Sequence, residues 1–163
     1  MFKLLNHPAF RGAFTGVAMI LAGILIKENN WQEAAWSQYV LFILYASGIA
    51  WSLWLAKRNP SNTGTFGALF QQGFRHFAVT SLVMVAFTFY ILWRHPEFAK
   101  EEAEHQRTLL IETKKYTPDQ INELVVEAEK QYPIRHISAT VFGYLFMGAV
   151  FAAAGSLVLA RKN

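Results

Sequence analysis

Histidines beside arginines are the residues of this chain with the clearest potential for chemistry. There are three Arg-His pairs, and two of the histidines, His95 and His136, flank the charged segment between the third and fourth apolar stretches. If these stretches are antiparallel helices, both imidazoles lie at one level and could bind a metal ion or a haem iron, with Glu97 nearby. No HExxH-type spacing accompanies them, however, and Arg and His also mark the headgroup boundary of membrane helices. We therefore predict no metal site and no cofactor.

Other catalytic signatures are missing from the sequence. The chain has no cysteine, which excludes thiolate chemistry, and it has no GxSxG motif or glycine-rich phosphate loop. Four clustered carboxylates lack the loop of a calcium site and are typical of a solvated helix: Glu97, Glu101, Glu102 and Glu104. Proton transport needs ionisable groups deep inside the membrane. The sequence offers no charged residue between Lys27 and Glu33 at one level and Arg11, Lys57 and Arg75 at the other. We therefore predict that the protein is not an enzyme.

Four apolar stretches must position these residues. The chain of 163 residues is 53% hydrophobic and 16% charged, whereas soluble domains carry about a quarter charged residues. A bilayer core about 30 Å thick needs roughly 20 apolar residues in a helix. The second and fourth stretches meet this length, and the first and third do so if Arg11 and Arg75 extend to the headgroups. The sequence thus predicts an all-α membrane protein, one domain over residues 1–163, with spans of about 9–26, 34–56, 76–93 and 137–160.

The charges predict how these spans are oriented. All the acidic residues fall on one side of the expected membrane, and the other side holds seven basic residues: Lys3, Arg11, Lys57, Arg58, Arg75, Arg161 and Lys162. Because short Lys/Arg-rich segments stay in the cytoplasm, both termini are predicted to be cytoplasmic. The net charge of +4 then indicates attraction to anionic membrane lipids, and no nucleic-acid partner is expected. No cleavage site follows Ile26, so the first stretch is expected to remain as a helix.

The connection before the third span has helical periodicity. Residues 65–75 are amphipathic, with Phe66, Leu69, Phe70 and Gly73 on one face. Either this segment lies along the inner membrane surface and bends near Gly73, which we favour, or it continues the third span as one long helix.

The connection between the third and fourth spans predicts a helical hairpin outside the cytoplasm, over residues 96–132. Thr117 is expected to cap the second arm, with Gln120 completing a capping box, and Pro133 is expected to end this arm before the fourth span. The second arm carries an apolar stripe that must cover something, either Leu109–Ile111 of the first arm or a second protein. The stripe consists of Ile121, Leu124, Val125, Ala128 and Tyr132.

Three segments resemble a small bacterial inner-membrane family known as domain of unknown function 4199. They are Phe66–Phe74 (FGALFQQGF), Tyr116–Ile121 (YTPDQI) and the last span, Gly143–Ala160, followed by Arg161 and Lys162. The resemblance covers most of the chain. It implies a four-helix protein of the bacterial inner membrane and brings no activity with it.

Small residues at helical spacing form the remaining signal. Gly12 and Gly16 make a GxxxG motif in the first span, where Gly23 follows, and small residues recur in the fourth span at Gly143, Gly148 and Ala152. Such spacing lets helix backbones approach closely in lipid. The contact is expected to be within the monomer or, alternatively, with a partner.

These features favour a non-catalytic protein that works by contact. The predicted function is an accessory or scaffold subunit of a bacterial inner-membrane complex, with membrane lipids and either other integral membrane subunits or further copies of itself as partners. The alternative is a small transporter or channel for uncharged solutes, including a homo-oligomeric one. Its lining would come from Ser37, Gln38, Ser47, Thr80, Ser81 and Thr88.

Overall fold

The structure, a computed structural model, is built of α-helices and describes residues 7–31, 34 and 36–160. The helices of this described part are α2 (Pro8–Glu28), α3 (Ser37–Arg58), α4 (Phe66–Arg94), α5 (Glu97–Thr113) and α6 (Pro118–Leu159). Four charged residues used to predict the orientation lie outside the described residues, namely Lys3, Glu33, Arg161 and Lys162, as does the side chain of Gln38.

Four of these helices, α2, α3, α4 and α6, are long and apolar enough to cross a membrane. The prediction of an all-α membrane protein with four spans is therefore confirmed, and the chain is a multi-pass membrane protein. Large hydrophobic side chains on these helices remain exposed on the protein, such as Leu82 and Phe142. A bilayer is the solvent that accepts such a surface.

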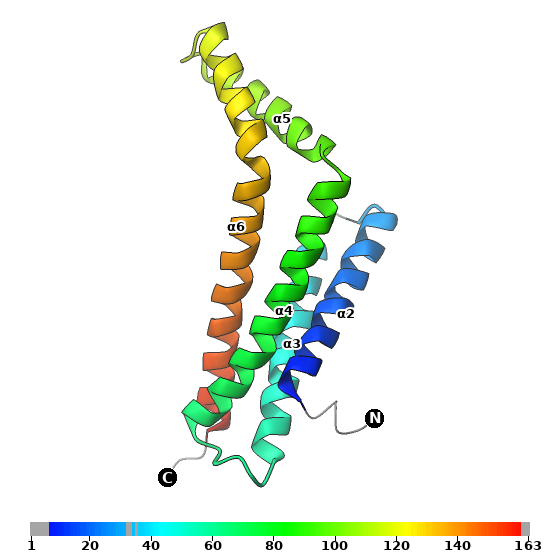
Figure 1. Cartoon of the computed structure of the whole chain (residues 1–163), viewed down its shortest axis with the longest axis vertical. Coiled ribbons are helices and arrows are strands. Elements are labelled where there is room, and N and C mark those ends of the chain that lie inside the picture. Colours follow the sequence, from blue (N-terminus) through cyan, green and yellow to red (C-terminus); the bar gives the residue numbers. More distant parts are fainter. Residues whose placement is uncertain (1–6, 32–33, 35, 161–163) are drawn as a thin grey trace. The chain divides into compact units, whose positions relative to one another are not determined.

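Contacts within the chain form two compact units, a division that was not predicted from the sequence. The first, which we call the bundle unit, comprises residues 1–84 and 141–163, and the second, the hairpin unit, comprises residues 85–140. Helices α4 and α6 contribute to both units (Figure 1).

Close helix contacts hold the bundle unit together. Its core contains Tyr45, Leu53 and Phe77 from α3 and α4, together with Ala152 from α6, all nearly or fully buried. Helix α2 joins through Gly12, where an added β-carbon would overlap the carbonyl oxygen of His76 in α4. Figure 1 shows the first turns of α2 and α4 and the last turns of α3 and α6 at the same end of this unit.

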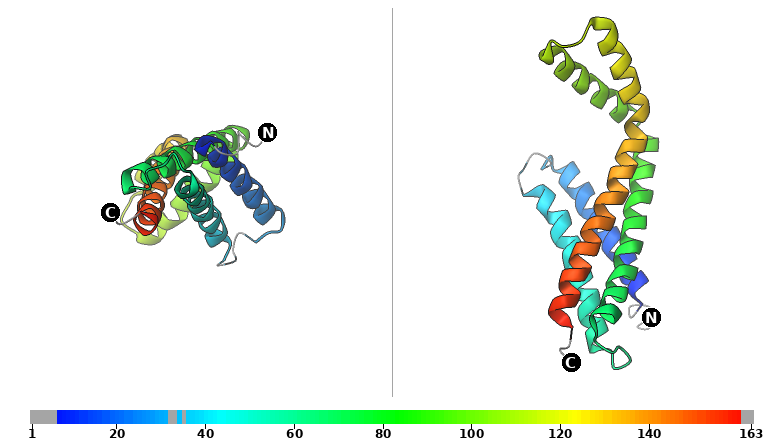
Figure 2. Two further views of the ribbon diagram at one scale, coloured as in Figure 1. Left: turned by 90° about the horizontal axis from the view of Figure 1, so that it is seen from below. Right: turned by 90° about the vertical axis from the view of Figure 1, so that its left-hand side faces the viewer.

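The hairpin unit contains α5 and the first part of α6, joined by a short turn (Figure 2). Its two arms match the predicted helical hairpin. The end predicted for the second arm is wrong, however, because α6 continues through Pro133 without a break up to Leu159. Proline deprives one carbonyl of its helical hydrogen bond, but helices of membrane proteins tolerate this loss where neighbouring groups satisfy the backbone.

Helix α4 is also continuous, from Phe66 to Arg94. Residues 66–75 therefore form one α-helix with the third span, which is the second of the two alternatives considered. Gly73, where a bend was favoured, instead lies in close contact with Ala152, whose β-carbon would be 2.8 Å from a β-carbon added at this glycine.

Candidate functional site

The hairpin unit has a small apolar core of its own. Ala103 from α5 and Ile121 and Val125 from α6 are 2%, 8% and 4% exposed, and Leu110 packs against them. The structure thus places two residues of the predicted stripe, Ile121 and Val125, against the first arm of the hairpin. Burial of these side chains holds the arms together by the hydrophobic effect.

Hydrogen bonds fix the turn between the two arms. Lys114 adopts a left-handed conformation with φ of 52° at the end of α5. The backbone nitrogen of Thr117 then donates to Oε1 of Gln120 at 2.9 Å, while the backbone nitrogen of Gln120 donates to Oγ1 of Thr117 at 3.4 Å. This pair of bonds is the predicted capping box.

An apolar groove of about 430 Å³ lies between the arms, and two further residues of the stripe line it. Leu124 and Ala128 from α6 line it opposite residues of α5 and the turn, and Leu109, Tyr116 and Leu124 are 49%, 43% and 41% exposed. The lining is completed by Gln106, Leu110, Glu127, Gln131 and Arg135. We call this groove the hairpin groove. The residues of the predicted stripe are thus divided between the buried hairpin core and the open hairpin groove.

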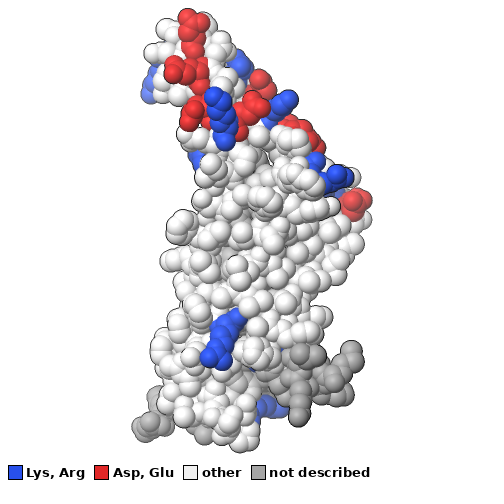
Figure 3. All heavy atoms as spheres, in the orientation of Figure 1, with Lys and Arg blue, Asp and Glu red and all other residues white. Residues whose placement is uncertain are grey.

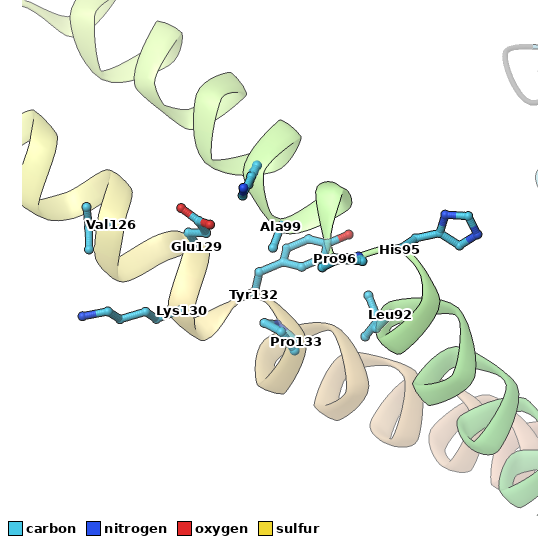
Figure 4. A pocket seen from close by; sticks show the side chains of 10 residues that line it. Leu92, His95, Pro96, Ala99, Val126, Glu129, Lys130, Tyr132 and Pro133 are labelled. Atoms are coloured by element: carbon cyan, nitrogen blue, oxygen red, sulfur yellow. The ribbon is translucent and has the colours of Figure 1, made fainter.

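Tyr132, the last residue of the stripe, lies in a separate pocket of about 450 Å³ in the hairpin unit (Figure 4). The pocket lies where α4 ends and α5 begins, beside Pro133, and Figure 4 shows the ring of His95 directed away from Tyr132. Burial raises the pKa of the Tyr132 phenol above its ordinary value, and the carboxylates of Glu102 and Glu101 add to this shift. The phenol therefore remains protonated and can donate a hydrogen bond.

The two histidines considered as metal ligands have other neighbours. Nδ1 of His95 lies 2.7 Å from Oε1 of Glu97, and the ring of His136 lies 5.4 Å from that of Tyr132. Within the described residues, no group of three or more His, Cys, Asp or Glu side chains is arranged to hold a metal ion.

Charged side chains of both signs are interspersed on the surface of the hairpin unit (Figure 3). Arg107 joins the two arms, because its Nη1 donates to Oδ1 of Asn122 at 2.7 Å and its Nε lies 3.1 Å from a carboxylate oxygen of Glu104. This surface is typical of a segment exposed to water, and it surrounds the apolar hairpin groove with polar groups.

A buried polar cluster in the bundle unit was not predicted from the sequence. Arg11, expected to extend to the headgroups, is only 3% exposed, and its Nη1 donates to the carbonyl oxygen of Ser52 in α3 at 3.2 Å. His76 in α4 is fully buried and interacts electrostatically with Arg11. Neither ring nitrogen of His76 has a hydrogen-bond partner among the described residues. The enclosure of Arg11 could not be predicted from the sequence, because it depends on the packing of α2 against α3 and α4.

Most of the predicted small-residue face packs inside the bundle unit. A β-carbon added at Gly16 would lie 2.8 Å from Cγ1 of Val83, and one added at Gly148 would overlap Tyr45 and crowd Phe77. Gly12 and Ala152 contact α4 in the same close manner. The remaining two predicted residues lie apart from these contacts, since nothing described lies within 4 Å of a β-carbon added at Gly23 or Gly143.

Hydroxyl groups proposed as a channel lining mainly bond to helix carbonyls. Oγ1 of Thr80 donates to the carbonyl oxygens of Gly12 and His76, and Oγ of Ser81 donates to that of Phe77. Ser47 likewise donates to the carbonyl of Leu44. Ser37 is buried, and Thr88 belongs to the hairpin unit.

Comparison with known proteins gives one family match. A family model described as a protein of unknown function, DUF4199, matches residues 11–161, nearly the whole chain. No curated protein and no solved structure matches it.

Proposed function

The chain belongs to the DUF4199 family, and from this premise we propose that it is a non-catalytic accessory subunit of a bacterial inner-membrane complex. It acts through its hairpin unit, which binds another integral membrane subunit. Membrane lipids surround its four spans, and both termini face the cytoplasm.

The observation that carries this proposal is the hairpin groove. Its apolar lining includes exposed side chains of Leu109, Tyr116 and Leu124, although the hairpin already has a core of its own. Exposed apolar side chains that gather in a groove rimmed by polar groups are typical of a surface that binds a protein. The predicted contact face therefore has a part that intramolecular packing leaves accessible.

The kind of partner follows from the position of the hairpin in the chain. Its first arm follows α4 after two residues, and its second arm is part of α6, and both of these helices are candidate spans. This connection tethers the groove to the membrane, which favours a partner held in the same membrane, another integral membrane protein. The mixed charges at the rim, such as Glu127 and Arg135, support selection of one partner over others.

Two substitutions on one arm test this proposal. Leu109→Glu places a carboxylate in the hairpin groove. Ile111→Glu is the control, because it places a carboxylate on α5 outside the groove. The side chains of Leu109 and Ile111 are similarly exposed, at 49% and 56%. We expect Leu109→Glu to reduce co-purification of partner subunits in mild detergent by about tenfold, because burying an unpaired charge in an interface is unfavourable. The measurement is quantitative mass spectrometry of the cross-linked complex from the native host.

The Ile111→Glu variant is expected to keep these partners at the level of the unmodified protein. An equal partner profile for both variants would contradict the role of the groove. Circular dichroism of each purified variant checks that the helices are retained.

A further inference from the structure

A polar pocket opens in the bundle unit, at the end where α3 finishes and α4 starts. Its volume is about 380 Å³, within the range of small-ligand sites. The lining comes from α2, α3, the following turn and α4: Arg11, Leu55, Ala56, Arg58, Asn59, Pro60, Ser61, Asn62 and Gln72. We call it the arginine pocket.

The charge of the arginine pocket is positive. Two arginines line it, none of its described lining residues is Asp or Glu, and residues 57–75 of the sequence contain no acidic residue. Arg11 is almost wholly buried and is held by its bond to the carbonyl of Ser52. The positive charge of this lining favours an anionic ligand.

The second guanidinium is also held in place. Cζ of Arg58 lies 3.7 Å from the centroid of the Trp54 ring, which is a cation–π contact. A guanidinium group so fixed loses less conformational freedom on binding, and its planar set of donors matches the oxygens of phosphate.

The turn after α3 adds neutral hydrogen-bond donors. Oδ1 of Asn59 accepts from the backbone nitrogen of Ser61 at 3.1 Å and from its Oγ at 2.8 Å, and Oδ1 of Asn62 accepts from the backbone nitrogen of Gly64 at 2.9 Å. Because these bonds use the carbonyl oxygens of the two side chains, the amide nitrogens remain as donors. The pocket is therefore rich in donors as well as in positive charge.

We propose that the arginine pocket binds a phosphate oxyanion, carried by a phospholipid headgroup or by free inorganic phosphate. Arg11 and Arg58 bind its charged oxygens, and the amides of the turn supply further donors. Exposed tryptophans on the same part of α3, Trp51 and Trp54, are typical of the headgroup level of a bilayer, where lipid phosphates lie. The apolar residues Leu55 and Ala56 in the lining suit the glycerol and upper acyl portion of a lipid.

Calorimetric titration of the full chain in a non-ionic detergent tests this inference. The probes are dihexanoyl phosphatidylglycerol, inorganic phosphate and, as a probe without phosphate, dihexanoylglycerol. The test variant is Arg58→Gln, and its matched control is Arg75→Gln, which removes the same charge from an exposed arginine of α4 outside the pocket. Arg58 is exposed, so its replacement leaves the core of the bundle intact.

We expect Arg58→Gln to weaken binding of the phosphate-bearing probe by about tenfold or more, the loss of one charge-assisted hydrogen bond. Arg75→Gln is expected to change this affinity by less than about twofold, because Arg75 does not line the pocket and its exposed charge is screened by solvent and salt. Arg58→Lys keeps the charge but loses the planar donors, and an intermediate affinity is expected.

The probes distinguish the two sources of phosphate. Tighter binding of the lipid than of inorganic phosphate identifies a headgroup site, and equal binding of both identifies a site for the free ion; each supports the inference. The inference is overturned if neither probe binds, if dihexanoylglycerol binds as tightly as the phospholipid, or if Arg58→Gln and Arg75→Gln have equal effects.

Discussion

Individual glycines determine how closely the helices of the bundle unit approach one another. At Gly12, the backbone of α2 meets the carbonyl oxygen of His76, and the hydroxyl of Thr80 bonds to the carbonyl oxygen of Gly12 at 2.9 Å. Such close contacts supply the packing energy that associates helices in lipid, where the hydrophobic effect between them is absent.

Replacing Gly12 by alanine should therefore destabilise the protein. The new methyl group would overlap a backbone carbonyl, which cannot move aside as the end of a side chain can. We expect Gly12→Ala to lower the free energy of unfolding by about 1–3 kcal/mol, as overpacking of a core does. The measurement is unfolding in mixed micelles of SDS and a mild detergent.

The matched control lies on the same helix. A β-carbon added at Gly23 meets nothing described within 4 Å, so Gly23→Ala should be neutral or slightly stabilising, since alanine is the better helix former. A loss of stability at Gly23 as large as that of Gly12→Ala would mean that the contact with His76 is not what makes Gly12→Ala destabilising.

Sequence spacing predicted part of this pattern. The GxxxG motif indicated a close approach at Gly12 and Gly16, but the surface that meets them, His76 and Val83 of α4, depends on which helices pack together. The same limit applies to Arg11. A single arginine near the start of a span predicts a position near the headgroups, but its enclosure, with the carbonyl of Ser52 accepting its hydrogen bond, depends on which helices pack together.

In the hairpin unit, the start of a helix could be predicted from the sequence where hydrogen bonds between nearby residues fix it. The Thr-Pro-Asp-Gln sequence gave the start of α6, because its capping box involves residues only three apart. The predicted end of this arm was wrong. A proline usually breaks the interior of a helix, but α6 contains Pro133 and continues to Leu159. The division of the apolar stripe between core and groove could not be predicted, because it depends on how α5 packs against α6.

Removal of the capping box should loosen the first turns of α6. Thr117→Ala deletes the hydroxyl that accepts from the backbone of Gln120, at a cost of about 1 kcal/mol. Hydrogen exchange of amides in residues 118–125 should then be faster by about fivefold, the factor that corresponds to this free energy. Mass spectrometry of peptides from this segment gives the measurement.

Thr108→Ala serves as the control for this change. Its exposed hydroxyl donates to the carbonyl of Glu104 within α5, so its loss leaves the start of α6 unchanged. Equal exchange of residues 118–125 in the Thr117→Ala variant and the unmodified protein would contradict a stabilising role of the capping box.

At the scale of the whole molecule, the four spans were predicted because length and apolar composition suffice to identify them. The orientation of the chain rests on its charges: every acidic residue falls in one set of alternating connections, including the hairpin. Basic segments remain on the cytoplasmic side during insertion, so the hairpin unit is proposed to face outward.

Cysteine labelling checks this orientation directly, since the chain contains no native cysteine. Lys114→Cys marks the turn of the hairpin and Thr63→Cys marks the connection between α3 and α4, and both positions are exposed. In intact spheroplasts, a membrane-impermeant maleimide should label the first variant, and it should label the second only after permeabilisation. The reverse order would show that the proposed orientation is wrong.

The contact of Arg58 with Trp54 also means that the fluorescence of Trp54 reports movement of the Arg58 guanidinium. An indole changes its fluorescence when a cation resting on its ring moves, and the guanidinium here lies 3.7 Å from the ring centroid. A ligand that draws this group away would alter the emission of Trp54 without any attached dye. Occupancy of that end of the helix bundle can therefore be followed by fluorescence, in detergent and in vesicles alike, with a Trp54→Phe variant giving the contribution of the other four tryptophans.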